Sequence, residues 1–140
     1  MQSFDFSNAP GHLVRRVHQV SIALFAQELA AFDVTAVQFA ILQTLLDTPG
    51  ADQITVAQAV ALDAATSGSV IGRLEARGWL RREADVQDKR RKLLWLTADG
   101  KQAARLMQRP AAAVQTKLLA ALTAAEKKQL LDILQKICAD

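Results

Sequence analysis

The chain has 140 residues, of which 51% are hydrophobic and 22% charged, and its formal net charge is +3. This length suffices for one domain with its own core, and the single cysteine, Cys138, excludes an internal disulfide framework. The absence of tyrosine argues against a base-stacking platform for single strands, and no signal pattern or membrane-length apolar run is present, so we expect a cytoplasmic protein without a membrane partner.

The first predicted element is a long amphipathic helix from Pro10 to about Phe32. Proline suits the first turn of a helix, where its missing N–H is not needed. Apolar residues then recur at steps of three and four, which is typical of a helix with one apolar face. They are Leu13, Val14, Val17, Val20, Leu24, Phe25 and Leu29. The length of this helix exceeds what one small core needs, which indicates a partner.

Two shorter helices follow, each with a predicted start signal. Thr35 and Gln38 have the spacing of a capping box, and the helix they open runs to Thr48-Pro49-Gly50. Thr55 and Gln58 have the same spacing and predict the start of a short helix.

The next helix is expected between an N-cap at Asp63 and a left-handed C-terminus at Gly78. One face of it is expected to lie against the core and carries Ser67, Val70, Ile71 and Leu74. The opposite face is small, and its two glycines, Gly68 and Gly72, each cost about 1 kcal/mol relative to alanine. Either close approach to DNA or packing against a neighbouring helix would offset that cost. A short helix, a turn and a second helix form the helix-turn-helix unit, whose second helix enters the major groove.

A β-hairpin is predicted next, with strands at Trp79–Glu83 and Lys92–Leu96 and a polar loop at 84–91. Between Arg73 and Lys92 there are eight basic and four acidic residues, so this segment carries +4 while the rest of the chain is nearly neutral. Such a basic region on a neutral background is typical of a phosphate-binding surface. The alternative is a solvated hairpin that is rich in arginine.

Two helices end the chain. Thr97 is a suitable cap for a helix from 98 to about 122, and Thr123 with Glu126 forms another capping box. The last helix has an apolar face with Leu130, Leu131, Leu134 and Ile137. The predicted fold is mainly α with a small β-hairpin wing. It is a single domain, 1–140, in which a winged helix-turn-helix core (35–97) lies between helical dimerisation arms (10–32 and 98–140).

Two motifs in this core resemble those of MarR-type transcriptional regulators. The wing reads Asp88-x-Arg90-x-x-x-Leu94-x-Leu96-Thr97 and is followed by Gly100, and the preceding helix ends Arg73-Leu74-Glu75-x-x-Gly78-Trp79-Leu80. The resemblance covers essentially the whole chain. It implies a homodimer that binds double-stranded DNA at a pseudo-palindromic operator. It also implies that Arg90 enters the minor groove while Asp88 holds it in place.

The candidate DNA-binding residues lie in three places: the short helix, the outer face of the Asp63 helix, and the wing. Hydroxyl groups bind phosphates or base edges, and arginine in a narrow minor groove reads its width. The family resemblance implies DNA contacts at Ala65, Thr66, Gly68 and Ser69. The full set is Thr55, Ala65, Thr66, Gly68, Ser69, Arg73, Asp88, Lys89, Arg90 and Arg91. Because the helix face is small, we expect specificity to depend more on DNA shape than on base contacts.

A second polar cluster lies on the first helix. Its members are His12, Arg15, Arg16, His18 and Gln19. The family resemblance implies that small aromatic acids bind between the helical arms and the winged core, and arginine and histidine are suited to hold a carboxylate. The alternative is that these are rim residues of an exposed helix.

The sequence therefore predicts a DNA-binding transcriptional regulator, most simply a repressor released by a small aromatic or heteroaromatic carboxylate such as a hydroxylated nicotinate or benzoate. Two alternatives are a thiol redox switch through Cys138 and a winged helix used only for protein–protein assembly. No nucleophile with a placed base, phosphate loop or pair of catalytic carboxylates is recognisable, so we expect no enzyme activity and no cofactor. His12, His18 and Cys138 lack the spacing of a closed metal site.

Overall fold

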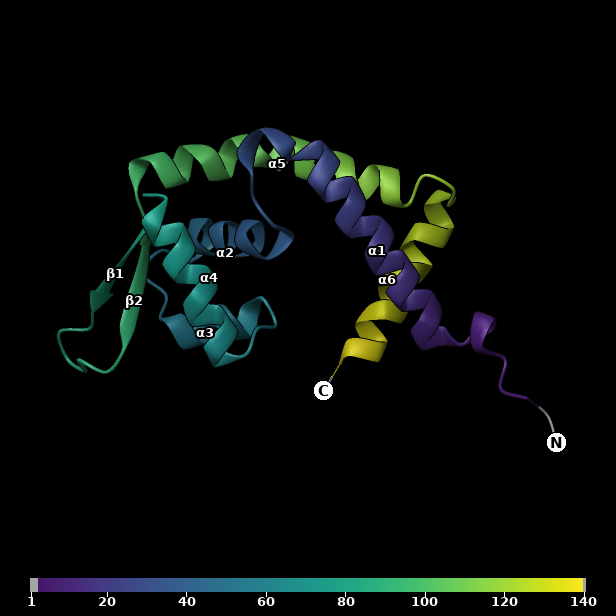
Figure 1. Ribbon diagram of the computed structural model, residues 1–140, viewed down its shortest axis with the longest axis horizontal. Coiled ribbons are helices and arrows are strands. Elements are labelled where there is room, and N and C mark those ends of the chain that lie inside the picture. Colours follow the sequence, from purple (N-terminus) through teal and green to yellow (C-terminus); the bar gives the residue numbers. More distant parts are fainter. Residues whose placement is uncertain (1–2, 140) are drawn as a thin grey trace.

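The computed structural model describes residues 3–139, so the two ends of the predicted domain, residues 1–2 and 140, lie outside it. Six α-helices and one antiparallel hairpin confirm the prediction of a mainly α fold with a β-hairpin wing (Figure 1). The helices are α1 (Pro10–Glu28), α2 (Ala36–Asp47), α3 (Gln53–Ala59), α4 (Ala64–Ala76), α5 (Ala98–Leu118) and α6 (Ala124–Cys138). The strands are β1 (Leu80–Ala84) and β2 (Lys92–Leu96), and single 3₁₀ turns lie at η1 (Phe6–Asn8) and η2 (Ala30–Phe32).

Helix α5 crosses the whole molecule and joins two parts (Figure 1). At one end of α5 lies the winged core, which consists of α2, α3, α4 and the hairpin. At the other end lie the terminal arms, α1 and α6. The C-terminal part of α1 packs along α5 and contributes Phe25 to the buried core.

The buried core is formed where α2, α4, the hairpin and α5 meet. Its fully buried side chains include Ile41, Leu42, Leu45, Ile71, Leu74, Leu94 and Met107. The predicted inner face of α4 is confirmed, because Ser67, Ile71 and Leu74 are buried and Val70 is half-buried. The opposite face of α4 is therefore left for a ligand or solvent.

Most of the predicted helix starts are confirmed. Complete capping boxes form at Thr35–Gln38 and Thr123–Glu126, and the side chains of Asp63 and Thr97 accept the capping hydrogen bonds of α4 and α5. The predicted capping box at Thr55 is wrong. Asp52 caps α3 instead, with Oδ1 accepting from the Thr55 N–H at 2.7 Å, because an aspartate three residues earlier offers the stronger cap.

Some predicted ends also differ. The first helix ends at Glu28 and is followed by the 3₁₀ turn η2 and by Asp33 in the left-handed region at φ +49°. Helix α5 ends at Leu118 rather than near residue 122. Strand β1 begins at Leu80, one residue later than predicted, whereas β2 has the predicted bounds and Gly78 has the predicted left-handed conformation at φ +79°.

The hairpin is fixed to the winged core by a short third segment. Leu80 pairs with Leu96 and Ala84 with Lys92, and β2 also exchanges backbone hydrogen bonds with residues 50–51. The Leu94 N–H donates to the Ala51 carbonyl and the Gly50 N–H donates to the Leu94 carbonyl, both at 2.9 Å. Gly50 has φ +80°, and a Cβ there would lie 2.7 Å from the Trp95 ring, so only glycine fits.

Among the residues that the structure describes, no single helix is long and apolar enough to cross a membrane. Helices α3 and α4 reach that length only together, as a pair bent by 104°.

Candidate nucleic-acid interface

The outer face of α4 presents small side chains to solvent. Ala65, Thr66, Ser69 and Arg73 are exposed and Gly68 is half-buried. The Thr66 hydroxyl and N–H both donate to the carboxylate of Asp63, at 2.9 and 2.7 Å, and these bonds lower the pKa of Asp63. The N-terminal half of α4 therefore has a rigid first turn and a nearly flat outer surface.

The two helix glycines have neighbours within the protein. A Cβ at Gly68 would lie 3.6 Å from Nε2 of Gln53 in α3, and one at Gly72 would lie 3.2 Å from Nη2 of Arg82 in β1. Arg82 is half-buried there, with its Nε 3.5 Å from Glu75 Oε1. At Gly72 the neighbour is a strand and not a helix, since the missing side chain makes room for the Arg82 guanidinium of β1.

The neighbouring Arg81 and Arg82 lie on opposite faces of the hairpin, as strand geometry predicts. Arg82 contacts α4, whereas Arg81 is exposed, pairs with Glu83 at 2.7 Å and lies over the Trp95 ring. Of these two arginines, Arg82 is therefore engaged with α4, whereas the partners of Arg81 lie within the hairpin.

The wing loop carries an arginine of the predicted set that is almost fully exposed. The Arg90 side chain is 94% exposed, and its Nε lies 3.4 Å from Asp88 Oδ1. The same carboxylate oxygen accepts from the Arg90 backbone N–H at 3.1 Å. Asp88 thus restrains the start of the side chain while the guanidinium extends into solvent. Lys89, next to it, is also exposed.

Arg91 differs from Arg90 because it is held by two carboxylates. Its Nη2 and Nε donate to Asp52 Oδ2 at 2.7 and 3.2 Å, and its Nη1 donates to Asp85 Oδ2 at 3.3 Å. Hydrogen bonds from Thr55 and then from Arg91 lower the pKa of Asp52 to about 2. Sequence reasoning placed Arg91 with the DNA contacts and missed this pairing, since Asp52 is 39 residues away in the chain.

Two shallow hollows lie on the same side of the winged core. One, of about 270 Å³, lies between α3 and α4 and is lined by Gln53, Ile54 and Ala57 among others. The other, of about 150 Å³, lies between the start of α3 and the wing and includes Ile54, Arg90 and Arg91. Thr55 is exposed at the start of α3, next to both. Figure 1 shows α3, the start of α4 and the wing loop at the end of the winged core that lies away from α5.

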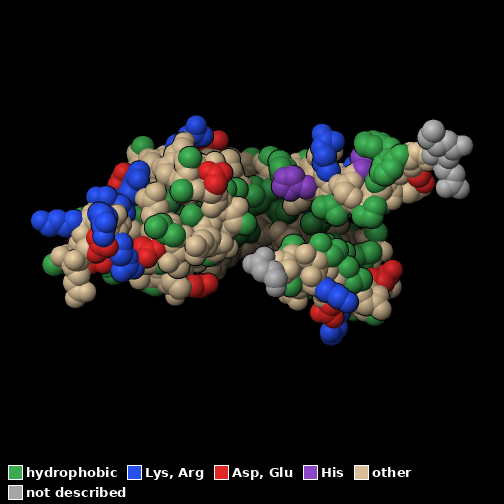
Figure 2. Space-filling view, turned by 90° about the horizontal axis from the view of Figure 1, so that it is seen from below, with side chains coloured by type: hydrophobic (Ala, Val, Ile, Leu, Met, Phe, Trp, Pro, Cys, Tyr) green, Lys and Arg blue, Asp and Glu red, His purple; other side chains and the backbone are tan. Residues whose placement is uncertain are grey.

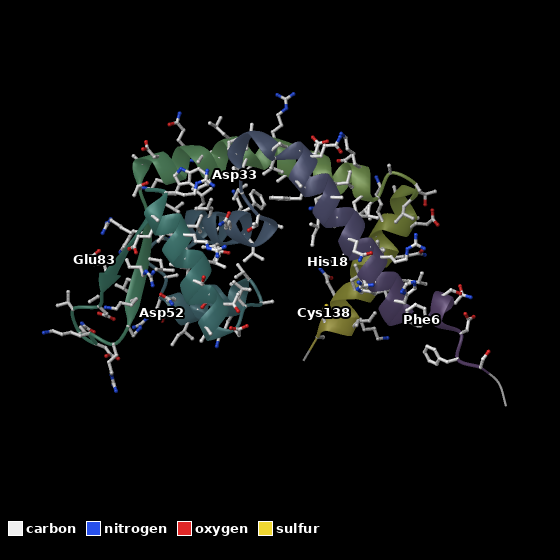
Figure 3. The ribbon with its side chains drawn as sticks, in the orientation of Figure 1. Phe6, His18, Asp33, Asp52, Glu83 and Cys138 are labelled. Carbon is white, nitrogen blue, oxygen red and sulfur yellow. The ribbon has the colours of Figure 1, made fainter. Side chains whose placement is uncertain are left out.

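The predicted effector residues all lie on α1, far along the chain from the wing. Arg15, Arg16, His18 and Gln19 are exposed, and His12 is half-buried beside Phe6, with ring centroids 4.4 Å apart. Figure 3 shows His18 on the arm side of the molecule, opposite Asp52 and Glu83 of the winged core. The structure thus places these five residues on α1, which belongs to the arms and not to the winged core.

Both terminal arms expose apolar side chains. None of the residues of α6 is buried, although Leu131, Ile133, Leu134 and Ile137 are large and apolar. On α1, Leu13, Val14, Val17 and Val20 are exposed as well. Figure 2 shows apolar side chains gathered on the arms, whereas lysine and arginine side chains gather at the wing end. A face of this kind usually marks an interaction surface.

Comparison with known proteins identifies a family match to the winged core and a similarity that covers nearly the whole chain. The model of the MarR family matches residues 34–92, which include α2, α3, α4 and the wing loop. The transcriptional regulator HosA of Escherichia coli O127:H6 is 32% identical over 130 residues, which cover 93% of this chain and 95% of HosA. The chain belongs to the MarR family.

Two solved structures of the MarR type extend the similarity to the arms. The PcaV regulator of Streptomyces coelicolor, in complex with its natural ligand, has a TM-score of 0.93 and 35% identity and covers 100% of both chains. BpsR of Bordetella bronchiseptica, whose DNA binding is regulated by 6-hydroxynicotinic acid, has a TM-score of 0.94 and 33% identity and covers 99% of both chains. MarR-family proteins are non-enzymatic, DNA-binding transcriptional regulators. This chain is therefore a DNA-binding transcriptional regulator.

In this MarR-family chain, Arg77 connects α4 with the end of the first arm. Its guanidinium donates to the carbonyls of Phe32 and Asp33 and lies 3.7 Å from the centroid of the Trp79 ring. Sequence reasoning missed this contact, because its partners are 44 and 45 residues earlier and are backbone atoms. The C-terminus of α4 is therefore attached directly to the segment where α1 ends.

Cys138 is an exposed free thiol at the end of α6. Over residues 3–139, no group of three or more histidine, cysteine, aspartate or glutamate side chains could hold a metal ion.

Proposed function

We propose that this protein is a homodimeric repressor that binds a pseudo-palindromic operator and is released from it by a small aromatic or heteroaromatic carboxylate. The observation that carries the DNA-binding part is the Arg90 side chain, which is 94% exposed in the wing loop. This loop lies at the same end of the winged core as α3 and the start of α4 (Figure 1). Binding to an operator also implies that the protein works in the cytoplasm.

The terminal arms support a homodimer. An α6 with no buried residue gains little by folding against its own chain, so a second copy is the natural cover for its apolar face. Burial of apolar surface stabilises association by about 25 cal/mol per Å² before the costs of association. We accordingly assign residues 10–32 and 98–140 to dimerisation and 35–97 to DNA binding. A two-fold axis through the arms would present two α4 helices to successive major grooves.

On the DNA, we assign the residues of the winged core to three kinds of contact. Thr55, Thr66, Ser69 and Arg73 would bind phosphates or base edges in and beside the major groove. Ala65 and Gly68 would permit close approach of α4. Arg90, held by Asp88, would enter the minor groove, and Lys89 would contact phosphates. Such a surface reads mainly shape.

For the effector, we assign the cluster on α1. Arg15, Arg16 and His18 would provide charge-assisted hydrogen bonds to a carboxylate, and His12 and Gln19 would bind ring substituents. The similarity to BpsR supports a hydroxylated nicotinate, and a hydroxybenzoate shares the same chemistry. Because Arg77 joins α4 to Phe32 and Asp33, an effector that moves α1 has a direct contact through which to move α4.

The test combines ligand binding with release of DNA. Hydroxynicotinates and hydroxybenzoates are screened by thermal shift, since a ligand that binds the folded state raises the melting temperature. Each positive acid is then titrated into a complex with a fluorescent operator duplex. We expect Arg15→Gln or Arg16→Gln to abolish release without loss of DNA affinity, whereas Arg109→Gln, an exposed arginine of α5, should respond like the parent. If substitutions at all five positions of the cluster leave release unchanged, the effector site lies elsewhere.

A further inference from the structure

The two adjacent arginines of the wing loop, Arg90 and Arg91, differ in exposure and in the number of carboxylates that they contact. Arg90 is 94% exposed and bound only to Asp88, two residues away. Arg91 is 49% exposed and bound to two carboxylates that are themselves only 17% exposed. A cation that already has two anionic partners is poorly placed to serve as a simple phosphate contact, so its role needs a separate explanation.

Asp52 uses its two oxygens for different tasks. Oδ1 accepts the Thr55 N–H and thereby caps α3, and Oδ2 accepts two N–H groups of Arg91. The carboxylate therefore links the first turn of the helix-turn-helix directly to the wing, and Figure 3 shows Asp52 between α3 and the hairpin. Residue 52 also forms a β-bridge with Leu93, which holds the backbone next to the pair in place.

Within the wing, Arg91 also closes the loop. Its carbonyl accepts the Asp85 N–H at 3.0 Å, and its N–H donates to the Asp88 carbonyl at 2.9 Å. Arg90 is thus bracketed, with Asp88 before it and the fixed Arg91 after it. The direction in which Arg90 leaves the wing depends on both neighbours.

We propose that Arg91, Asp52 and Asp85 form a clamp that positions the wing against α3, so that Arg91 orients Arg90 for the minor groove instead of binding a phosphate itself. This inference rests on the proposed role of Arg90 in DNA binding. The sequence pattern placed Arg91 among the DNA contacts, and the geometry assigns it to positioning.

Whether Asp52→Asn raises or lowers DNA affinity distinguishes a positioning role of Arg91 from a phosphate contact. Asp52 carries a negative charge on the DNA-binding side, so its removal by itself should strengthen binding to a polyanion. Asp52→Asn retains an N-cap acceptor, because asparagine caps helices as well as aspartate does. If the clamp positions Arg90, the loss of the Arg91 pairing must outweigh the electrostatic gain and weaken binding. If Arg91 is a phosphate contact held back by Asp52, the same change must strengthen binding.

The experiment measures the affinity of the full-length protein for duplexes with A·T-rich and G·C-rich flanks across a salt series. We expect Asp52→Asn to bind the A·T-rich duplex about two- to fivefold more weakly than the parent, as for an ion pair of this exposure. Its discrimination between the duplexes should fall, and its salt slope should stay that of the parent. Arg91→Gln should reproduce the lost discrimination, and the double variant should be no worse than the weaker single variant.

Two controls make the outcomes distinct. Asp63→Asn is the matched variant, because Asp63 caps α4 with a 2.7 Å hydrogen bond from a backbone N–H, as Asp52 caps α3. Among the described residues, the Asp63 side chain forms no hydrogen bond or ion pair with a wing arginine. Arg90→Ala tests the proposed function, and in that background Asp52→Asn should have no further effect on discrimination. If Arg90→Ala binds like the parent, the proposed role of Arg90 fails. If Arg90→Ala weakens binding but Asp52→Asn binds DNA as tightly as the parent or more tightly, the clamp is overturned. It is also overturned if Asp63→Asn weakens binding as much as Asp52→Asn does.

Discussion

The winged core and the terminal arms differ in where their large apolar side chains lie. In the winged core they are buried or half-buried, except for Ile54 and Val86, which are exposed. In the arms most are exposed, and α6 buries none. The winged core is therefore complete within one chain, whereas the arms are suited to a partner. The exposed groups of the winged core are instead polar and basic, as a surface for DNA requires.

The largest expected effect comes from a charge on an apolar arm. Leu134→Asp should abolish dimerisation, because an unpaired carboxylate would be buried in the interface. Sedimentation should then show the mass of one 15.2 kDa chain, where the parent shows twice that mass. Operator affinity should fall by about 10²–10⁴, since the two half-sites are no longer linked.

Gln135→Asp serves as the control, since it adds the same charge at a neighbouring polar position of α6. It should remain dimeric. If Leu134→Asp has the mass and operator affinity of the parent, the apolar face of α6 is not the dimer interface.

In the winged core, the expected effect is on folding. Leu74 is fully buried, so Leu74→Ala should lower the free energy of unfolding by about 2–5 kcal/mol. Val86→Ala, at a side chain 93% exposed, should change it by less than about 0.5 kcal/mol. Urea denaturation at one protein concentration measures both. Equal effects at the two positions would contradict the packing of α4.

A smaller effect is expected at the wing tip. Arg90→Ala should weaken operator binding by about 1–3 kcal/mol and reduce the preference for A·T-rich flanks. Lys89→Ala is the matched change in the same loop, and it should weaken all duplexes alike and lower the salt slope by about one unit. Fluorescence anisotropy across a salt series distinguishes them. Identical behaviour of the two variants would mean that the wing binds only phosphates.

The smallest effect is a pH dependence at Asp52. Its pKa lies at about 2, below the ordinary value of 3.8. A lowered pKa in the folded state means that the ionised carboxylate stabilises the fold above about pH 4, and that this contribution is lost as the pH falls to about 2. The difference in melting temperature between the parent and Asp52→Asn should therefore shrink over that range. A difference that grows as acid is added would contradict the assigned pairing.

Much of the fold could be predicted because its signals are local. Capping boxes at Thr35 and Thr123, the left-handed Gly78 and the face of α4 all depend on residues within one or two turns. The cap of α3 was mispredicted because Thr55 and Gln58 have the spacing of a capping box, although Asp52, three residues earlier, is the stronger N-cap residue. For the candidate site, the sequence could predict only which helix or loop carries each residue.

Contacts between distant segments could not be predicted. The pairing of Arg91 with Asp52 and the bonds from Arg77 to Phe32 and Asp33 depend on how the helices pack, which no spacing encodes. Gly100 is similar. A Cβ there would lie 1.9 Å from the Trp79 carbonyl oxygen, so this glycine is required by a contact 21 residues away rather than by its own helix.

The central claim is that two copies of this chain read one operator through α4 and Arg90, and selection from random-sequence duplexes tests it most directly. The account predicts an enriched inverted repeat with half-site centres about 10–10.5 base pairs apart, or a multiple of that, and A·T-rich segments beside each half-site. With Arg90→Ala the repeat should persist and the A·T-rich segments should disappear. Enrichment of no repeat, or of the same A·T-rich segments with both proteins, would contradict it.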